Sequence, residues 1–346
     1  MNYIDNFLEK LLSETDDIYL FGAGKLAGWI TPLLEKKGID YNGYIVDKQY
    51  LPAERTINGK KVITADELER DAVIVIAVET GGKAVELTGK HIRKVYQFDW
   101  IASIPFGCHD DSFLTEHGTE FLDLYRKLSD FESKASLISF FCQRFTGEFH
   151  KQRSFKPQYY DEMIIKPRAG EFFVDCGAYN GDSLKGFISF LKRNGIETFE
   201  KCIAIEPDVG NFEELKKNFA GYDDVEVYNL ATFDKKCTLH FDGGNGTGSS
   251  IEESGGTEIG ADTIDNIVNG GKVTYIKMDV EGAELSTLKG AKETIKKYKP
   301  RLAVCVYHKL EDILEIPRFI LSLDPSYKLY MRNYESFGLE TVLYAV

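Results

Sequence analysis

The chain has 346 residues, a formal net charge of −13, and 43% hydrophobic and 28% charged residues. This length suits two domains of ordinary size, and the composition is that of a folded globular protein. The acidic excess argues against general nucleic-acid binding. Since we find neither an apolar run of eighteen residues nor a basic leader before an apolar core, we expect no membrane span, no signal peptide and a cytoplasmic location.

The six cysteines are scattered and form no Cys-x-x-Cys pair. Three of them, Cys176, Cys202 and Cys305, lie inside apolar strand patterns, which is typical of reduced, buried thiols. We therefore predict no zinc site. No other metal site is predicted, and a divalent cation held by the carboxylates of Asp279 and Glu281 is the alternative.

The elements expected in the first hundred residues alternate between strands and helices, as in a parallel sheet with helical crossovers. This alternation predicts a small Rossmann-like domain over residues 1–104. The expected strands are 18–21, 43–46, 61–63, 72–78 and 95–98, and the expected helices are 1–12, 29–37, 65–70 and a segment after Gly81-Gly82.

A glycine pattern follows the first of these strands. Gly22 and Gly24 come first, Ala27 follows three residues later, and Asp47 ends the second strand. This order is that of the dinucleotide fingerprint and predicts a second nucleotide site. The domain resembles the small Rossmann-like domains at the front of sugar-modifying acyltransferases, which implies a nucleotide-sugar as ligand. A degenerate scaffold that forms a homodimer or docks a partner is the open alternative.

Residues 105–165 break the alternation. Helical spacing is present at 121–128 and 131–145, and residues 151–166 are polar and irregular. We predict a helical connector here, with the main boundary near residue 150.

Alternation resumes in the last part of the chain, residues 166–346, where seven strands are expected. Residues 242–262 are too rich in glycine for a core element, so we predict a long lid or binding loop, with Ser249 and Ser250 contacting substrate. The expected strands are 172–175, 202–206, 225–230, 273–278, 302–307, 327–331 and 341–346.

Acidic residues and glycines follow the first two strands of this part. Asp175 ends one strand and is followed by Gly177 and Gly181, and Glu206 ends the next strand. Ligands of open parallel sheets bind at the carboxyl ends of the strands, and glycines let a ligand approach the backbone closely. An acid at the second strand end is the usual partner of two ribose hydroxyls. These residues together predict a nucleoside cofactor.

A third motif, Asp279 to Glu284, follows the strand at 273–278. The motifs read Val174-Asp175-Cys176-Gly177-Ala178-Tyr179-Asn180-Gly181, Ile205-Glu206-Pro207-Asp208, Thr263-Ile264-Asp265 and Ile276-Lys277-Met278-Asp279-Val280-Glu281-Gly282-Ala283-Glu284. With them the chain resembles the FkbM family of S-adenosylmethionine-dependent methyltransferases over roughly residues 155–346. Cys176 and Tyr179 depart slightly from the family pattern.

The resemblance implies an α/β architecture with a seven-stranded class I methyltransferase sheet whose last strand is antiparallel. It also implies S-adenosylmethionine as cofactor and O-methylation of a sugar or another small metabolite. We place Glu206 at the ribose, with the other cofactor residues around the donor. A helix cap is the alternative for Asn180. The cofactor residues are Asp175, Gly177, Asn180, Gly181, Glu206 and Asp279.

The transferring methyl group is expected near Asp279, for which a plain salt bridge to Lys277 is the alternative. His308 follows the fifth strand and is the preferred general base, because its ordinary pKa lies near working pH. Asp279 is the rival base. Glu281 is expected to position the acceptor, with pairing to the glycine loop as the alternative. Glu284 is expected to be a first-turn helix residue stabilised by the helix dipole.

Two other classes of function compete with a methyltransferase. One is a non-catalytic nucleotide-sugar-binding protein whose methyltransferase fold is only structural. The other is an NAD-dependent oxidoreductase built on the first domain, which lacks a recognisable domain for hydride chemistry. The expected partner is a small-molecule acceptor, and neither nucleic acid nor a membrane is expected.

Overall fold

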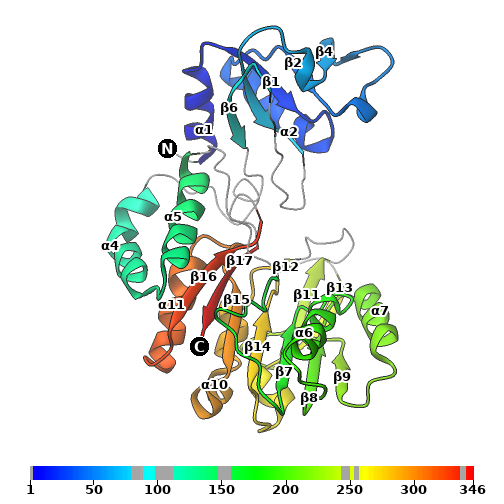
Figure 1. Ribbon diagram of the computed structural model, residues 1–346, viewed down its shortest axis with the longest axis vertical. Helices are drawn as coiled ribbons and strands as arrows, with labels where there is room; N and C mark the ends of the chain where they lie inside the picture. The colour runs from blue at the N-terminus through cyan, green and yellow to red at the C-terminus, as the bar shows by residue number, and fades with distance from the viewer. Residues whose placement is uncertain are drawn as a thin grey trace. The chain divides into compact units, whose positions relative to one another are not determined.

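The computed structural model divides the chain into two compact units (Figure 1). The first unit comprises Met1–Thr119, Ala135–Ser154 and Asn333–Glu340, and the second comprises Glu120–Lys134, Phe155–Arg332 and Thr341–Val346. The structure describes residues 3–78, 87, 89–97, 112–146, 157–242, 250–252, 257–335 and 340–346.

The first unit contains a six-stranded sheet in the order β3-β4-β2-β1-β5-β6. The sheet is parallel apart from β3, which runs antiparallel to β4 at the edge. The β5 run of five β-branched and small residues is buried throughout, as expected for a strand covered on both faces. The strands are β1 (Asp17–Phe21), β2 (Gly43–Ile45), β3 (Thr56–Ile57), β4 (Lys60–Ile63), β5 (Ala72–Ile76) and β6 (Ile92–Gln97).

The helices of this unit follow the predicted order with changed ends. Helix α1 spans Tyr3–Leu12, and α2 spans Lys25–Lys37, so α2 begins four residues before the predicted start. The helix predicted over 65–70 is wrong, because only a 3₁₀ turn forms there (η2, Ala65–Glu67). Another short turn, η1, covers Lys48–Tyr50. The segment after Gly81-Gly82 lies outside the described residues.

Two long helices occupy the predicted connector: α4 (Ser112–Lys127) and α5 (Phe131–Thr146). Asp130 caps α5 by accepting the backbone N–H of Ser133 at 2.8 Å. Within the second unit, the buried guanidinium of Arg332 reaches Asp130 at 2.7 Å and Asp161 at 3.1 Å. The domain limits 1–104, 105–165 and 166–346 stay a prediction.

The second unit contains the predicted seven-stranded sheet, in the order β16-β17-β15-β14-β7-β8-β9. Its last strand, β17, runs antiparallel to β15, as predicted. Each predicted strand has a counterpart, and the apolar runs of β7, β14 and β15 are buried throughout, as is typical of strands covered on both faces. They are β7 (Phe172–Cys176), β8 (Lys201–Ile205), β9 (Val225–Tyr228), β14 (Tyr275–Met278), β15 (Arg301–Cys305), β16 (Leu329–Asn333) and β17 (Thr341–Ala345).

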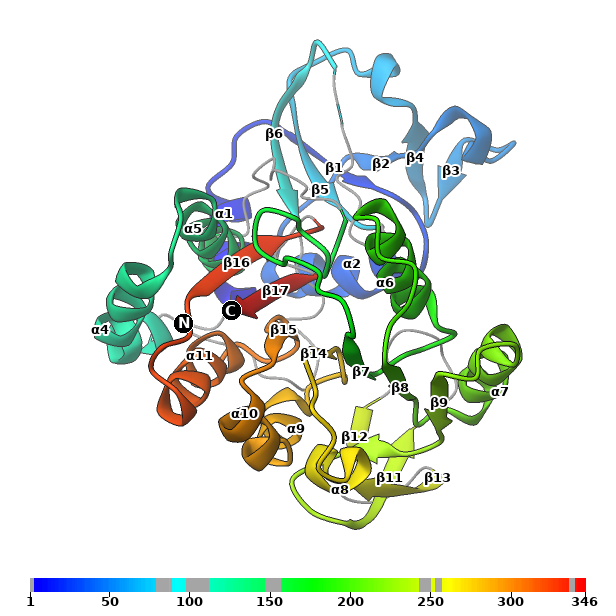
Figure 2. The same ribbon diagram turned by 60° about the horizontal axis from the view of Figure 1, so that its bottom comes forward.

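The strand order reverses between β7 and β14, which pair in parallel at the centre of the sheet. Right-handed crossovers in opposite directions put helices on opposite faces, and Figure 2 shows α6 on one side of the sheet and α9 and α10 on the other. A reversal of this kind opens a crevice at the carboxyl ends of the strands. The helices are α6 (Asp182–Arg193), α7 (Val209–Phe219), α8 (Ile264–Val268), α9 (Glu284–Lys289), α10 (Lys292–Tyr298) and α11 (Asp312–Leu323).

The prediction of a long loop over residues 242–262 is wrong for much of that segment. A four-stranded sheet forms in the order β10-β13-β11-β12. Alternate residues of β13, Ile259 and Ala261, are buried in a small apolar cluster, and this spacing of two outweighs the glycine content. The strands are β10 (Ala231–Thr232), β11 (Cys237–Asp242), β12 (Ser250–Glu252) and β13 (Thr257–Asp262). Ser250 begins β12, and Ser249 lies outside the described residues.

Among the helices that the structure describes, none is long and apolar enough to cross a membrane.

Candidate active site

Gly177 brings the ends of β7 and β14 together. Its φ is +74°, and a Cβ at this position would lie 1.7 Å from the backbone oxygen of Asp279. The backbone N–H groups of Gly177 and Ala178 both donate to the Ile205 carbonyl at 3.0 Å. A glycine is therefore required here by a close approach of backbone to backbone, whether or not a ligand is bound.

Packing between helices explains why residue 181 is a glycine. Its φ is +88°, and a Cβ would lie 2.3 Å from Cε2 of Phe219 on α7. The preceding Asn180 is half-buried, and its carbonyl accepts the side-chain amide of Asn218 at 2.9 Å. The N-cap position of α6 is Gly181, so the alternative of Asn180 as the cap is wrong. Contact of Asn180 and Gly181 with a cofactor stays a prediction.

Asp175 lies in the interior, with no exposed surface. Its carboxylate forms an ion pair with Lys277 at 3.2 Å and accepts the hydroxyl of Ser183. Lys277, itself buried, also donates to the Gly177 carbonyl at 2.7 Å. Burial lowers the pKa of Lys277, but the charges of Asp175 and Asp279 outweigh it and the pKa is raised. Asp175 therefore acts on the glycine turn through Lys277, and direct contact with a donor molecule is not favoured.

Glu206 lies at the end of β8, beside the glycine turn. One carboxylate oxygen accepts the backbone N–H of Tyr179 at 2.8 Å, and the other accepts that of Asp208 at 2.9 Å. Burial raises the pKa of Glu206, while these backbone donors oppose the rise. The side chain of Asn211 also donates to this carboxylate, so Glu206 is held in a fixed orientation at the strand end and still has acceptor capacity for a hydroxyl group.

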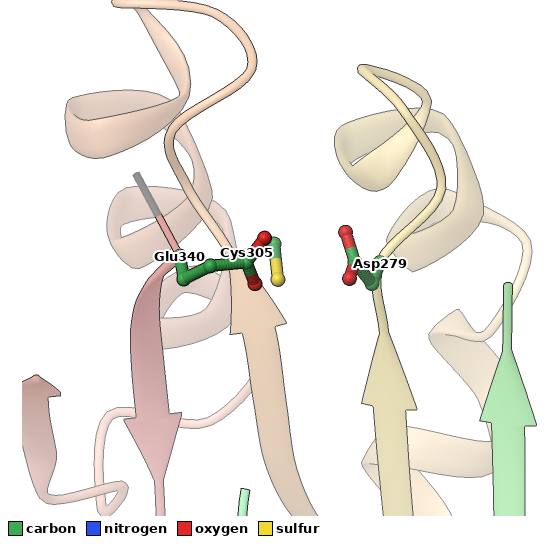
Figure 3. Close-up of side chains that lie close together, drawn as sticks. All are labelled: Asp279, Cys305 and Glu340. Carbon is green, nitrogen blue, oxygen red and sulfur yellow. The ribbon is translucent and has the colours of Figure 1, made fainter. Parts of the chain in front are cut away.

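Asp279 follows β14, and Cys305 ends the neighbouring strand β15 (Figure 3). The hydroxyl of Tyr159 donates to Oδ2 of Asp279 at 2.9 Å, and that of Tyr307 lies 3.5 Å from Oδ1. Burial works to raise the pKa of Asp279, but the positive charges of Lys277 and His308 lower it overall. Asp279 is therefore ionised at neutral pH.

The alternative in which Asp279 forms a plain salt bridge with Lys277 is not what the structure shows. Lys277 forms its ion pair with Asp175 instead. The Asp279 side chain keeps 21% of its surface exposed, whereas that of Asp175 keeps none. Of the two strand-end aspartates, only Asp279 is available to a substrate.

His308 is buried among carboxylates. Its Nδ1 lies 2.9 Å from Glu284, and its Nε2 lies 3.3 Å from Glu281 and 3.7 Å from Asp279. Burial favours the neutral ring, but these acids raise the pKa of His308 well above its ordinary value. An imidazolium at neutral pH has no free lone pair to accept a proton, so the structure argues against His308 as general base.

Glu284 is more than the first-turn helix residue that the sequence suggested. It is fully buried, accepts the backbone N–H of Val280 at 3.0 Å and forms the ion pair with His308. Glu281 differs because its side chain is 37% exposed, which suits contact with a substrate. Donor atoms of Asp279, Glu284 and His308 lie within 4.8 Å of one another, and because His308 is protonated, ion pairs rather than metal coordination hold this cluster together.

Sequence reasoning missed Tyr159, which contacts Asp279 from a segment predicted to be polar and irregular. The signal available was the pair Tyr159-Tyr160, two adjacent aromatic residues inside that segment.

In the first unit, the predicted nucleotide residues gather at the ends of β1 and β2. Gly22 has a φ of +106°, and its Cβ would lie 2.2 Å from Val78, so packing requires this glycine. Gly24 is exposed with open space around it, Ala27 is buried, and Asp47 is exposed before η1. The structure thus leaves Gly24 and Asp47 accessible, and a ligand for them stays a prediction.

Residues 175–329 match the family model described as the methyltransferase FkbM domain. This matched region lies within the second unit and contains the strand-end acids Asp175, Glu206 and Asp279 and the buried His308. A search of curated proteins found no match.

The whole chain is similar in fold to the methyltransferase FkbM from Methylobacillus flagellatus KT. That match has a TM-score of 0.73 and 22% identity, and it covers 99% of this chain and 93% of the other. An rRNA methylase from Streptococcus thermophilus matches with a TM-score of 0.31 and 14% identity, covering 51% and 86%. Aeropyrum pernix fibrillarin with natively bound S-adenosyl-L-methionine matches with a TM-score of 0.31 and 8% identity. That match covers 52% of this chain and 67% of the other.

Proposed function

We propose that the protein is an S-adenosylmethionine-dependent methyltransferase that methylates a hydroxyl oxygen of a sugar or another small metabolite. The observation that supports this best is the meeting of the glycine turn, Glu206 and Asp279 at the strand ends where the sheet order reverses. The match of residues 175–329 to the methyltransferase FkbM domain supports the reaction class.

Glu206 is the residue best placed to hold the donor. Its two oxygens are fixed by backbone donors, and we place the ribose hydroxyls at this carboxylate. The backbone of Gly177 to Tyr179 lines the same turn. When bound, S-adenosylmethionine would supply a methyl group on a positively charged sulfur, and the carbon of that methyl group would be open to in-line attack by the acceptor oxygen.

Asp279 is the proposed base. Because its pKa is lowered, it is ionised and can accept the acceptor's hydroxyl proton through its partly exposed carboxylate. The proton would move to Asp279 as the bond from oxygen to the methyl carbon forms and the bond from that carbon to sulfur breaks, which leaves S-adenosylhomocysteine. Glu281 is proposed to position the acceptor, as are Ser249 and Ser250. His308 holds Glu281 and Glu284 in place as a cation.

A direct test is the release of S-adenosylhomocysteine when the purified protein is mixed with S-adenosylmethionine and a small-molecule extract of cells. We expect release that depends on the extract and is lost in Asp279→Asn. A protein that binds the donor and releases nothing with any extract would support the non-catalytic alternative.

The first unit is proposed to bind a nucleotide or nucleotide-sugar at Gly24 and Asp47. The proposal rests on the open space where a Cβ of residue 24 would lie and on the exposure of Asp47. Thermal-shift measurements on the full chain with nucleotides and nucleotide-sugars test it, and Asp47→Ala should abolish any shift. No shift at millimolar ligand would favour the scaffold alternative.

A further inference from the structure

Tyr159 has an uncommon backbone conformation for a residue with a side chain. Its φ is +65°, in the left-handed region. Strain of this kind persists only where the surrounding structure determines the conformation, and it clusters at functional sites. Contacts around Tyr159 must therefore hold its backbone in this conformation.

The backbone of Tyr159 is held on both sides by tyrosine hydroxyls from the sheet. Its N–H donates to the hydroxyl of Tyr344 on β17 at 2.9 Å, and its carbonyl accepts the hydroxyl of Tyr275 on β14. Tyr275 and Tyr344 are both fully buried. Two buried tyrosines of the sheet thus hold the backbone of one residue in an irregular segment.

The side chain of Tyr159 is held as well. Nζ of Lys277 lies 5.3 Å from the centre of the ring, within the range of a cation–π interaction, and Tyr159 is buried. Its hydroxyl lies 3.5 Å from the sulfur of Cys305 and donates to Oδ2 of Asp279 at 2.9 Å. The fixed backbone and ring leave the hydroxyl directed at the carboxylate.

The two oxygens of Asp279 consequently differ. Among the described residues, Oδ2 has the short hydrogen bond from Tyr159, and Oδ1 has longer contacts with Tyr307 at 3.5 Å and His308 at 3.7 Å. The thiol of Cys305 also forms a hydrogen bond with this carboxylate. Oδ1 is therefore the less tightly held oxygen and the one better able to take a new partner.

We propose that Tyr159 is a positioning residue that fixes Oδ2 of Asp279 and thereby presents Oδ1 to the methyl acceptor. The catalytic part of this inference rests on the proposed function, while the coupling between Tyr159 and Asp279 does not. Substitution of Tyr159 should therefore raise the proton affinity of the Asp279 carboxylate even when neither donor nor acceptor is bound.

The test compares Tyr159→Phe with Tyr160→Phe. Tyr160 is also buried, and its hydroxyl donates to the Ser183 carbonyl at 2.6 Å, so the control loses an equivalent hydrogen bond away from Asp279. The carboxyl groups of ¹³C-labelled aspartate are titrated by NMR in the full chain, with Asp279→Asn identifying the signal. We expect at least a threefold gain in proton affinity at Asp279 in Tyr159→Phe and no change in Tyr160→Phe.

Turnover gives the second measurement. In the extract assay, Tyr159→Phe should release S-adenosylhomocysteine at least tenfold more slowly, with an unchanged KM for S-adenosylmethionine, while Tyr160→Phe retains the wild-type rate. If Tyr159→Phe does not fold, Tyr344→Phe tests the same point, because it releases the Tyr159 backbone and should also raise the proton affinity of Asp279.

An unchanged Asp279 titration in Tyr159→Phe, or an equal change in Tyr160→Phe, would overturn the inference. The titration contains no donor, so its failure is separate from failure of the proposed function. A shifted titration in a protein that never releases S-adenosylhomocysteine would support the coupling and contradict the methyltransferase.

Discussion

Gly177 and Asp279 lie so close that any side chain on the glycine would collide with the backbone of the aspartate. A Cβ on Gly177 would be 1.7 Å from the Asp279 carbonyl oxygen. This approach joins the glycine turn after β7 to the acid after β14. The proposed donor site and the proposed base are thus parts of one rigid edge of the sheet.

Gly177→Ala should destabilise the protein strongly, because the Cβ collides with backbone that cannot move aside cheaply. We expect a free energy of unfolding lower by about 3 kcal/mol or more, as the cost of the left-handed conformation and of overpacking add. Urea unfolding measures it.

Gly195→Ala is the matched control. Gly195 has nearly the same φ, +73°, but open space where a Cβ would be. The Gly195→Ala variant should have a free energy of unfolding lower by only about 1–2 kcal/mol. Equal losses in the two variants would show that the approach to Asp279 imposes no constraint.

Glu206→Ala should weaken binding of S-adenosylmethionine at least tenfold, which corresponds to about 1.4 kcal/mol. The physical reason is the loss of the acceptors for the ribose hydroxyls. Isothermal titration calorimetry measures the affinity, with Glu226→Ala as control, because Glu226 is exposed on β9 and pairs with Lys201. Wild-type affinity in Glu206→Ala would remove the ribose assignment.

His308→Gln should lower the free energy of unfolding at pH 6 by roughly 3 kcal/mol, since it leaves the buried carboxylate of Glu284 without its partner. The pKa of His308 is raised in the folded protein. Its stabilisation is therefore fully present below the unfolded pKa, about 6.5, and is lost as pH rises through the folded value.

Chemical unfolding of His308→Gln and wild type across this pH range checks the prediction. The difference between the two proteins should shrink towards high pH. A difference that grows with pH would mean that the ring is neutral in the fold.

Asp312→Asn should raise the free energy of unfolding at pH 9 by at least about 1 kcal/mol. Burial, with the charge of Glu284, raises the pKa of Asp312 to about 8. An acid whose folded pKa is raised costs stability as pH climbs from its unfolded value through the folded one, and the amide removes this cost. Unfolding curves at pH 5 and pH 9 measure it, and an equal effect at both would contradict the raised pKa.

The main sheet was predictable because its strands are apolar runs that end in acids. The run from Phe172 to Val174 is apolar and fully buried in β7. Asp175 near the end of β7, Glu206 after β8 and Asp279 after β14 lie at the edge of the sheet where these strands end. The four-stranded sheet was not predictable in the same way. Its strands are short or only half apolar, with Ile259 and Ala261 as the inward residues of β13.

The chemistry of the site was less predictable than its location. The charge on His308 depends on Glu284, which is 24 residues earlier in the chain and approaches it only in the fold. Tyr159 reaches Asp279 across 120 residues, from a segment without periodicity. The local sequence pattern carries no information about such pairs, because only the fold brings these distant residues together.

The most direct test of the central claim is a crystal structure of the protein with S-adenosylhomocysteine. The account predicts the product in the crevice between the ends of β7 and β14, with its ribose hydroxyls on Glu206 and its sulfur facing Asp279. An empty crevice at saturating product, or a ribose bound away from Glu206, would contradict it.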